Sequence, residues 1–115
     1  MNQNQDQTLI VMTTVPDDVT ARQLAQSLIE QRLAACAQVV AGMTSIYRWK
    51  GAIQQESEVL VLIKTVSSRY QALAEALTGL HPYEVPEIVA VAAERVSPEY
   101  DRWVRQSMNL EREGF

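Results

Sequence analysis

Residues 53–65 constrain the fold of this chain more than any other segment, because the two halves of the segment differ in character. The first half, "IQQESE", is polar, whereas "VLVLI" at 59–63 is apolar at every position. Side chains of a β-strand alternate between the two faces of a sheet, so an uninterrupted apolar run predicts that both faces are covered. Residues 36–49 are rich in β-branched and aromatic side chains, and "WKGA" at 49–52 predicts a turn. The two segments are therefore expected to form a long hairpin.

Three segments have the sequence pattern of amphipathic helices. Asp17 is a good N-cap for the first, whose apolar residues recur at i, i+3, i+4, i+7 and i+8. Ser68 and Gln71 resemble a capping box at the start of the second. Ser97 followed by Pro98 predicts the first turn of the third. Each helix has one apolar stripe, which is expected to cover part of a sheet.

Two further strands complete the pattern. Residues 8–14, "TLIVMTT", are apolar and β-branched and stop before Pro16, and residues 87–93, "EIVAVAA", have the same character. Gly42 predicts a bulge or a bend in the long strand of the hairpin. The order βαββαβ with an added terminal helix predicts an α+β, ferredoxin-like sandwich with helices on one face of an antiparallel sheet.

The apolar run at 59–63 leaves one face of this predicted sheet without a cover. Too few helices are present to coat both faces, so the second apolar face is expected to pack against another copy of the chain. We therefore predict a homo-oligomer. Replacing Val61 with Asp is expected to disrupt that assembly, because it would place an unpaired charge at the contact between copies.

Composition excludes several classes of partner. The 115 residues suffice for one domain, predicted at 8–108, with a flexible N-terminal tail at 1–7 and a C-terminal tail at 109–115. The net charge is -4 and no run of Lys or Arg occurs, so nucleic acid is not an expected partner. The N-terminal tail lacks the apolar stretch of a signal peptide, and the run at 59–63 is too short to span a bilayer, so no membrane contact is expected. The single cysteine, Cys36, cannot form an internal disulfide and fits a reducing compartment, so we predict a cytoplasmic protein.

The loop "LHPYEVPE" at 80–87 contains the only histidine of the chain, His81, and has two interpretations. Its two prolines disfavour helical geometry in the residues before them, so the loop can serve to end a helix, with His81 capping the last carbonyls. Alternatively, His81, Tyr83, Glu84 and Glu87 gather an imidazole, a phenol and two carboxylates, as a metal or anion site needs. Under the second interpretation, His81 with Glu84 or Glu87 is the candidate for binding a metal ion.

The hairpin offers a second group of candidate residues. Tyr47 and Trp49 share one face of its first strand, and Glu58 and Lys64 share one face of its second. These faces either line a ligand-binding cleft, where Lys64 supplies a positive charge for a small anion, or provide packing anchors at a subunit contact. The predicted cleft residues are Tyr47, Trp49, Glu58, Lys64, Tyr83 and Glu87.

Nothing in the sequence indicates catalysis. No serine-histidine-acid order stands out, and no glycine-rich phosphate loop is present. Cys36, at the start of a buried strand, is interpreted as a small hydrophobic residue, and Trp103 as a structural residue of the third helix. We therefore do not expect an enzyme.

Five stretches carry a resemblance to a known family: "TTVPD", "RLAACAQVVAGMTSIYRWKGAI", "ESEVLVLIKT", "HPYEVPEIV" and "YDRW". In this order and spacing they resemble the CutA family of divalent-cation-tolerance proteins, from about Thr8 to Trp103. The resemblance implies a ferredoxin-like subunit and a homotrimer built through the long hairpin, similar in shape to the PII-type signalling proteins. It implies no enzyme activity.

The metal site best known in bacterial members of that family has a cysteine before the "T-x-P-D" turn and a His-His pair before "P-Y". This chain has Thr13, Leu80 and His81 at those positions. The leading prediction is a non-enzymatic homotrimer that takes part in the response to metal ions and binds copper or another divalent cation weakly. The alternatives are a PII-like sensor that binds a small metabolite or anion at inter-subunit clefts, and an interaction scaffold.

Overall fold

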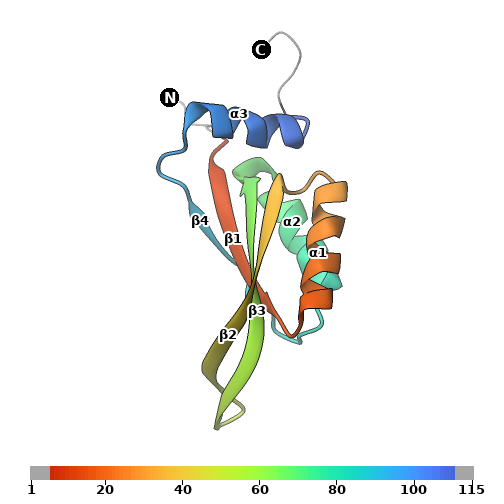
Figure 1. The fold of residues 1–115 in the computed structure, drawn as a ribbon, viewed down its shortest axis with the longest axis vertical. Coiled ribbons are helices and arrows are strands. Elements are labelled where there is room, and N and C mark those ends of the chain that lie inside the picture. The colour runs from red at the N-terminus through yellow and green to blue at the C-terminus, as the bar shows by residue number, and fades with distance from the viewer. Residues whose placement is uncertain (1–5, 111–115) are drawn as a thin grey trace.

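The computed structural model describes residues 6–110, which form four strands, three α-helices and one 3-10 turn. The strands form one antiparallel sheet in the order β2-β3-β1-β4. The predicted α+β, ferredoxin-like fold is therefore confirmed (Figure 1). In chain order the elements are β1 (Thr8–Val15), α1 (Asp18–Glu30), β2 (Cys36–Trp49), β3 (Ala52–Val66), η1 (Ser67–Arg69), α2 (Tyr70–Leu80), β4 (Val89–Ala92) and α3 (Pro98–Ser107).

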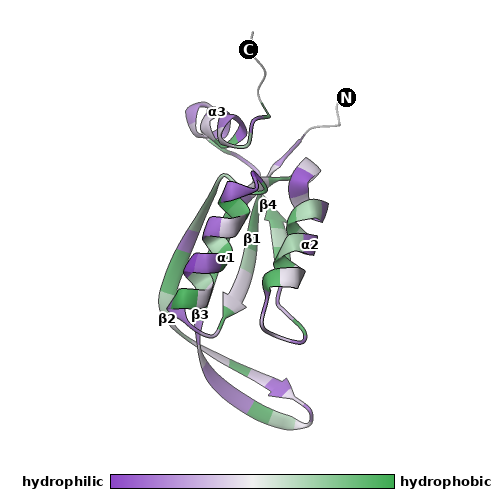
Figure 2. Ribbon diagram, turned by 90° about the vertical axis from the view of Figure 1, so that its right-hand side faces the viewer, coloured by the Kyte–Doolittle hydropathy of each residue, from purple (hydrophilic) through white to green (hydrophobic). Residues whose placement is uncertain are grey.

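Helices α1 and α2 lie side by side on one face of the sheet (Figure 2). Asp17 caps α1 as predicted, because its Oδ1 accepts a hydrogen bond from the Thr20 N–H at 2.8 Å. Ser68 does not cap α2: its hydroxyl donates to Asp6 Oδ2 at 2.7 Å, and α2 begins only after the 3-10 turn. The predicted capping box is therefore wrong, because a carboxylate distant in the sequence is the partner of the hydroxyl.

The core lies between α1, α2 and the covered face of the sheet. Val11 of β1 and Val61 and Ile63 of β3 point toward the helices and have no exposed surface. Leu28 of α1 and Leu77 of α2 belong to the same cluster and are equally buried. Burying each of these side chains contributes about 1.5–3 kcal/mol, so this layer provides much of the stability of the domain.

The opposite face of the sheet is apolar and remains open along most of its length. Leu60 and Leu62 of β3 point to it, and Leu62 pairs with Met12 of β1, which pairs with Val89 of β4. The first three are half-buried and Val89 is 46% exposed. Val61 points the other way, so the prediction that Val61 lies at a contact between copies is wrong: one step along a strand moves a side chain to the other face.

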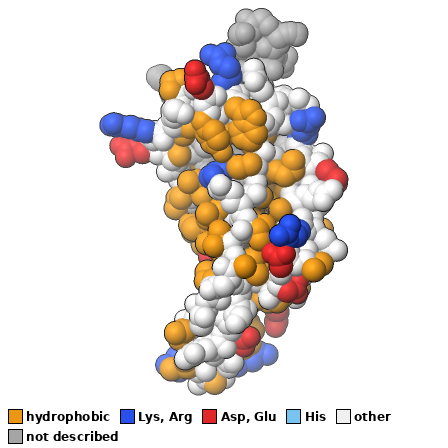
Figure 3. Space-filling view, viewed as in Figure 1, with side chains coloured by type: hydrophobic (Ala, Val, Ile, Leu, Met, Phe, Trp, Pro, Cys, Tyr) orange, Lys and Arg blue, Asp and Glu red, His pale blue; other side chains and the backbone are white. Residues whose placement is uncertain are grey.

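Helix α3 covers only one end of this open face. Val104 of α3 and Met108, which directly follows the helix, are fully buried and pack against Ala35 and Val66. Figure 3 shows hydrophobic side chains gathered over the strands below α3. An apolar strip between α3 and the projecting hairpin is therefore left without a helical cover.

The molecule measures 54 × 29 × 23 Å, and the β2–β3 hairpin projects beyond the rest of it (Figure 1). Lys50 and Gly51 have φ values of 50° and 83°, and two positive φ angles in succession are what a two-residue type I′ turn requires. Gly42, at φ 84°, lies in a bulge between Val40 and Met43, so the predicted bulge is confirmed. A bulge bends the strand and increases its twist, and the outer half of the hairpin lies beside the loop after α2.

Asp6 belongs to the predicted N-terminal tail and is nevertheless bonded to the domain: its Oδ1 accepts from the Ser68 N–H at 2.7 Å. The rest of that tail, residues 1–5, and residues 111–115 of the predicted C-terminal tail lie outside the described part of the chain. Within residues 6–110, no helix combines the length and the apolar character that crossing a membrane requires.

Candidate functional site

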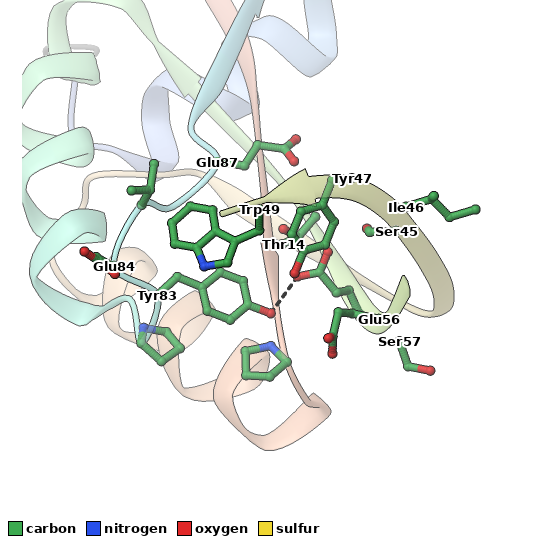
Figure 4. A pocket seen from close by; sticks show the side chains of 14 residues that line it. Thr14, Ser45, Ile46, Tyr47, Trp49, Glu56, Ser57, Tyr83, Glu84 and Glu87 are labelled. Carbon is green, nitrogen blue, oxygen red and sulfur yellow. Dashed lines mark hydrogen bonds between the residues drawn. The ribbon is translucent and has the colours of Figure 1, made fainter. Parts of the chain in front are cut away.

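A groove of about 790 Å³ lies between the outer half of the β2–β3 hairpin and residues 82–87 (Figure 4). The register pairs Tyr47 with Gln54 and Ser45 with Glu56, so alternate residues of the two strands share the face that turns toward the loop. Five of the six predicted cleft residues meet here. The side chains that decide its chemistry are Tyr47, Trp49, Glu56 and Glu58 from the hairpin and Tyr83, Glu84, Val85 and Glu87 from the loop.

Glu58 and Tyr83 are joined across the groove by a short hydrogen bond, in which the Tyr83 hydroxyl donates to Glu58 Oε2 at 2.6 Å (Figure 4). Glu58 is only 7% exposed. Burial, followed by the hydrogen bond to Glu58, raises the pKa of Tyr83 well above its usual range, so the hydroxyl remains a donor at neutral pH. Burial and then the charges of Glu56 and Glu58 also raise the pKa of Tyr47. The groove therefore has a negative potential.

His81 lies behind the groove and uses both ring nitrogens to hold the loop against β1. Nε2 is 2.9 Å from the Thr14 carbonyl oxygen and 3.1 Å from Thr13 Oγ1, and Nδ1 accepts from the Tyr83 N–H at 3.2 Å. An accepting Nδ1 requires the hydrogen on Nε2, so the ring is neutral and donates to Thr14. Burial lowers the pKa of His81, although the bond to Thr14 and the charge of Glu58 act in the opposite direction. The ring therefore has a structural role in this domain.

The side chains proposed as metal ligands do not converge. Glu84 and Glu87 line the groove and are exposed, whereas His81 is 9% exposed and both its nitrogens are bonded. A metal ion at Nδ1 would have to displace the Tyr83 N–H. Within the described part of the chain, no group of three or more His, Cys, Asp or Glu side chains is placed to hold a metal ion. These residues therefore do not fit a resident metal ion within one chain.

The remaining predicted residues lie outside the groove lining: Lys64 and Cys36 are on the open face of the sheet, and Trp103 is on α3. Lys64 Nζ donates to Gln38 Oε1 at 2.9 Å. Cys36 is partly buried, with Sγ 3.5 Å from the Tyr100 hydroxyl, and this contact, followed by burial, raises the pKa of Tyr100 to about 12. Trp103 is 44% exposed and its ring centroid is 5.5 Å from that of Tyr100. Cys36 and Trp103 therefore belong to the end of the sheet that α3 covers.

Sequence analysis missed Glu56 of the groove and both threonine partners of His81. Glu56 had a usable signal, because it precedes Glu58 by two residues and therefore shares its face of the strand. The family resemblance places Thr13 and His81 at positions of one metal site but gives no hydrogen bond between them, and Thr14 had no signal as a partner of His81. Their contact joins residues 67 and 68 positions apart, which local pattern does not reveal.

Comparison with known proteins identifies relatives along almost the whole described chain. The family model described as CutA1 divalent ion tolerance protein matches residues 9–107. The chain is 45% identical over 98 residues to the divalent-cation tolerance protein CutA of Thermus thermophilus, covering 85% of this chain and 95% of that protein. It is 46% identical over 93 residues to protein CutA of Mus musculus, covering 81% of this chain and 52% of the mouse protein, so it spans about half of that relative.

Solved structures agree with these matches. The divalent cation tolerance protein (Cut A1) of Thermus thermophilus superimposes with a TM-score of 0.84 at 44% identity, covering 87% of this chain and 97% of that one. CutA of Synechococcus elongatus superimposes with a TM-score of 0.86 at 36% identity, covering 90% of this chain and 92% of that one. The fold and the groove define a small ferredoxin-like domain with a projecting hairpin. The chain belongs to the CutA1 divalent ion tolerance family.

Proposed function

We propose that this chain acts in divalent-cation tolerance as a cytoplasmic, non-enzymatic homotrimer that responds to metal ions. Membership of the CutA1 family carries the proposal, because the match extends over residues 9–107 and a relative named for this role is 45% identical. The proposal of three copies in the assembly rests on the resemblance to the CutA family.

The open face of the sheet supports assembly. Val40, Val89 and Val91 are 44%, 46% and 45% exposed on this face. Val40 pairs with the half-buried Leu60 of β3, and Val89 and Val91 pair with Met12 and Ile10 of β1. Contiguous exposed apolar surface on a small soluble domain is typical of a protein contact. A second and a third copy of the chain are the proposed cover.

Metal binding in this proposal is weak and transient. Copper or another divalent cation would reach His81 together with Glu84 or Glu87 only after the bond from the Tyr83 N–H to Nδ1 had opened. The loss of that bond, together with the movement of a buried ring, opposes binding. Two exposed carboxylates add few fixed ligands.

The test combines molar mass and metal titration on the full chain. Light scattering is expected to give three times the 12.9 kDa of one chain, and calorimetric titration with Cu(II) and Zn(II) to give weak binding that His81→Ala reduces. A mass of one chain would contradict the assembly. Equal metal binding by His81→Ala would remove His81 from the site, and no binding by either protein would remove metal contact from the proposal.

A second candidate function is the binding of a small molecule, as in a PII-like sensor. The groove of about 790 Å³ favours it, because such a volume, lined by exposed rings and by polar groups, has the size of ligand pockets in proteins. In the trimer this groove would lie near a subunit boundary formed by the hairpins. A sensor for an anion would need a positive charge from outside the lining, since Lys64 lies on the open face.

A further inference from the structure

The charge of the groove is one-sided. Its lining contains Glu56, Glu58, Glu84 and Glu87, and no Lys, Arg or His among the described residues. An uncompensated group of carboxylates attracts a cation. Exposed carboxylates alone are commonly solvated by water. The case for a bound cation therefore depends on a carboxylate that water does not reach freely.

Glu58 is that group. It is 7% exposed, yet it lines the groove, and within residues 6–110 its Oε1 has no hydrogen-bond donor and its charge has no salt-bridge partner. Its one bond, from the neutral Tyr83 hydroxyl, reaches Oε2. A buried carboxylate is costly unless it is paired and fully hydrogen-bonded. The groove therefore lacks one positive donor at Glu58 Oε1.

Aromatic rings surround the place where this donor would lie. Tyr47 and Trp49 are 43% and 39% exposed on the hairpin side, and Tyr83 faces them from the loop side (Figure 4). Faces of such rings attract cations. Lys50 Nζ already lies over the Trp49 ring, 5.7 Å from its centroid, and Lys50 is not among the residues that line the groove.

The surroundings favour an organic cation over a metal ion. A divalent metal ion needs several converging oxygen ligands, and no group of three suitable side chains exists in the described chain. An ammonium or guanidinium group instead needs one carboxylate for its N–H donors and aromatic faces for its charge. Glu58 and the three rings offer that combination.

We propose that the groove between the β2–β3 hairpin and residues 82–87 binds a small organic cation, whose ammonium or guanidinium group donates hydrogen bonds to Glu58 and lies against Tyr47, Trp49 and Tyr83. The inference rests on the second proposed function, small-molecule binding, and gives its ligand a chemical class. It is independent of metal binding at His81. The sequence had suggested a small anion as the ligand of the cleft, whereas this proposal names a cation.

The experiment titrates the full chain with butylguanidinium and, separately, with butylurea, a neutral planar analogue, by calorimetry. Butylguanidinium is expected to bind saturably and at least about tenfold more tightly than butylurea, because only the cation satisfies Glu58. Glu58→Gln is expected to weaken butylguanidinium binding about tenfold or more. The control is Glu75→Gln, an exposed carboxylate of α2 outside the groove, and it is expected to leave binding unchanged.

Trp49→Leu provides a second variant if Glu58→Gln does not fold, because Trp49 lies near the hairpin tip and is partly exposed. It is expected to weaken binding about threefold to tenfold. Equal affinity for butylurea, undiminished binding by both groove variants, or no saturable binding up to about 10 mM would overturn the inference. Binding of inorganic phosphate without butylguanidinium binding would overturn it while leaving a sensor for anions. Absence of both would also remove the support for the sensor.

Discussion

The two faces of strand β3 are built from the same kinds of side chain and differ in what covers them. Val61 and Ile63 face α1 and α2 and have no exposed surface. Leu60 and Leu62, which alternate with them, are only half-buried on the open face. The difference separates two tasks within one strand: alternate residues build the subunit, and the residues between them provide the surface that assembly is proposed to cover.

The comparison predicts that a charge has its largest effect on the covered face. Val61→Asp is expected to prevent stable folding, because it buries a carboxylate with no partner at a cost of several kcal/mol. Leu62→Asp is expected to retain the helical signal in circular dichroism while light scattering shows loss of the assembled mass. The matched pair places the same charge at adjacent positions. A folded, assembled Val61→Asp protein would show that the two faces do not differ in this way.

Shortening an apolar side chain is expected to show the same difference between the covered and the open face, with smaller effects than a buried charge. Leu73 of α2 is fully buried against the covered face, so Leu73→Ala is expected to lower the free energy of unfolding by about 2–5 kcal/mol. Leu62→Ala removes the same atoms from a half-buried position. In denaturant titrations at a concentration where the chains are dissociated, Leu62→Ala is expected to cost clearly less. Equal losses would mean that the open face is packed within the subunit.

Sequence pattern was enough for the fold because the elements follow local rules. The alternation in "VLVLI", the cap at Asp17 and the bulge at Gly42 were each predictable from a few neighbouring residues and were confirmed. The same alternation also held the information that Val61 and Leu62 face opposite ways. The error lay in assigning Val61 to the open face, which requires knowing the side on which the helices pack.

The candidate site was only partly predictable, for a physical reason. Alternation along the strands groups Tyr47 with Trp49 and Glu56 with Glu58, and these four residues do meet. Lys64 shares the face of Glu58 but lies six residues further along β3, which is about 20 Å at ~3.3 Å per residue, so a shared face does not bring it into the groove. The bonds that occupy the only histidine are long-range and leave no local signature.

The loop beside the groove is expected to make the free energy of unfolding depend on pH, because it contains His81. His81 is the only histidine, and burial lowers its pKa below the usual 6.5. The unfolded chain therefore takes up a proton at higher pH than the folded one. Stability is expected to be constant above about pH 6.5 and to fall as pH is lowered below it, by at most ~1.4 kcal/mol per pH unit. Chemical denaturation of the wild type between about pH 5 and 7 measures this slope.

The matched variant is His81→Gln, which retains an N–H donor and does not titrate. It is expected to be less stable at pH 7 and to lose the pH dependence in that window, because no other side chain of this chain has an ordinary pKa there. An identical slope in His81→Gln would assign the pH dependence to other groups.

The smallest predicted effect concerns the end of the open face that α3 covers. Asp101 of α3 accepts from Thr8 Oγ1 at 2.8 Å and from Arg105 Nε at 3.0 Å, and so ties the helix to β1. Asp101→Asn is expected to lower the free energy of unfolding by about 1 kcal/mol, since one charge-assisted contact is weakened and the position is partly exposed. Asp18→Asn is the control: Asp18 also lies in a first helical turn, and its only paired side chain, within residues 6–110, is the exposed Arg22. Among the described helices, only α3 packs on the open face. If Asp101→Asn lowers the free energy of unfolding no more than Asp18→Asn does, the packing of Val104 and Met108 alone holds α3 in place.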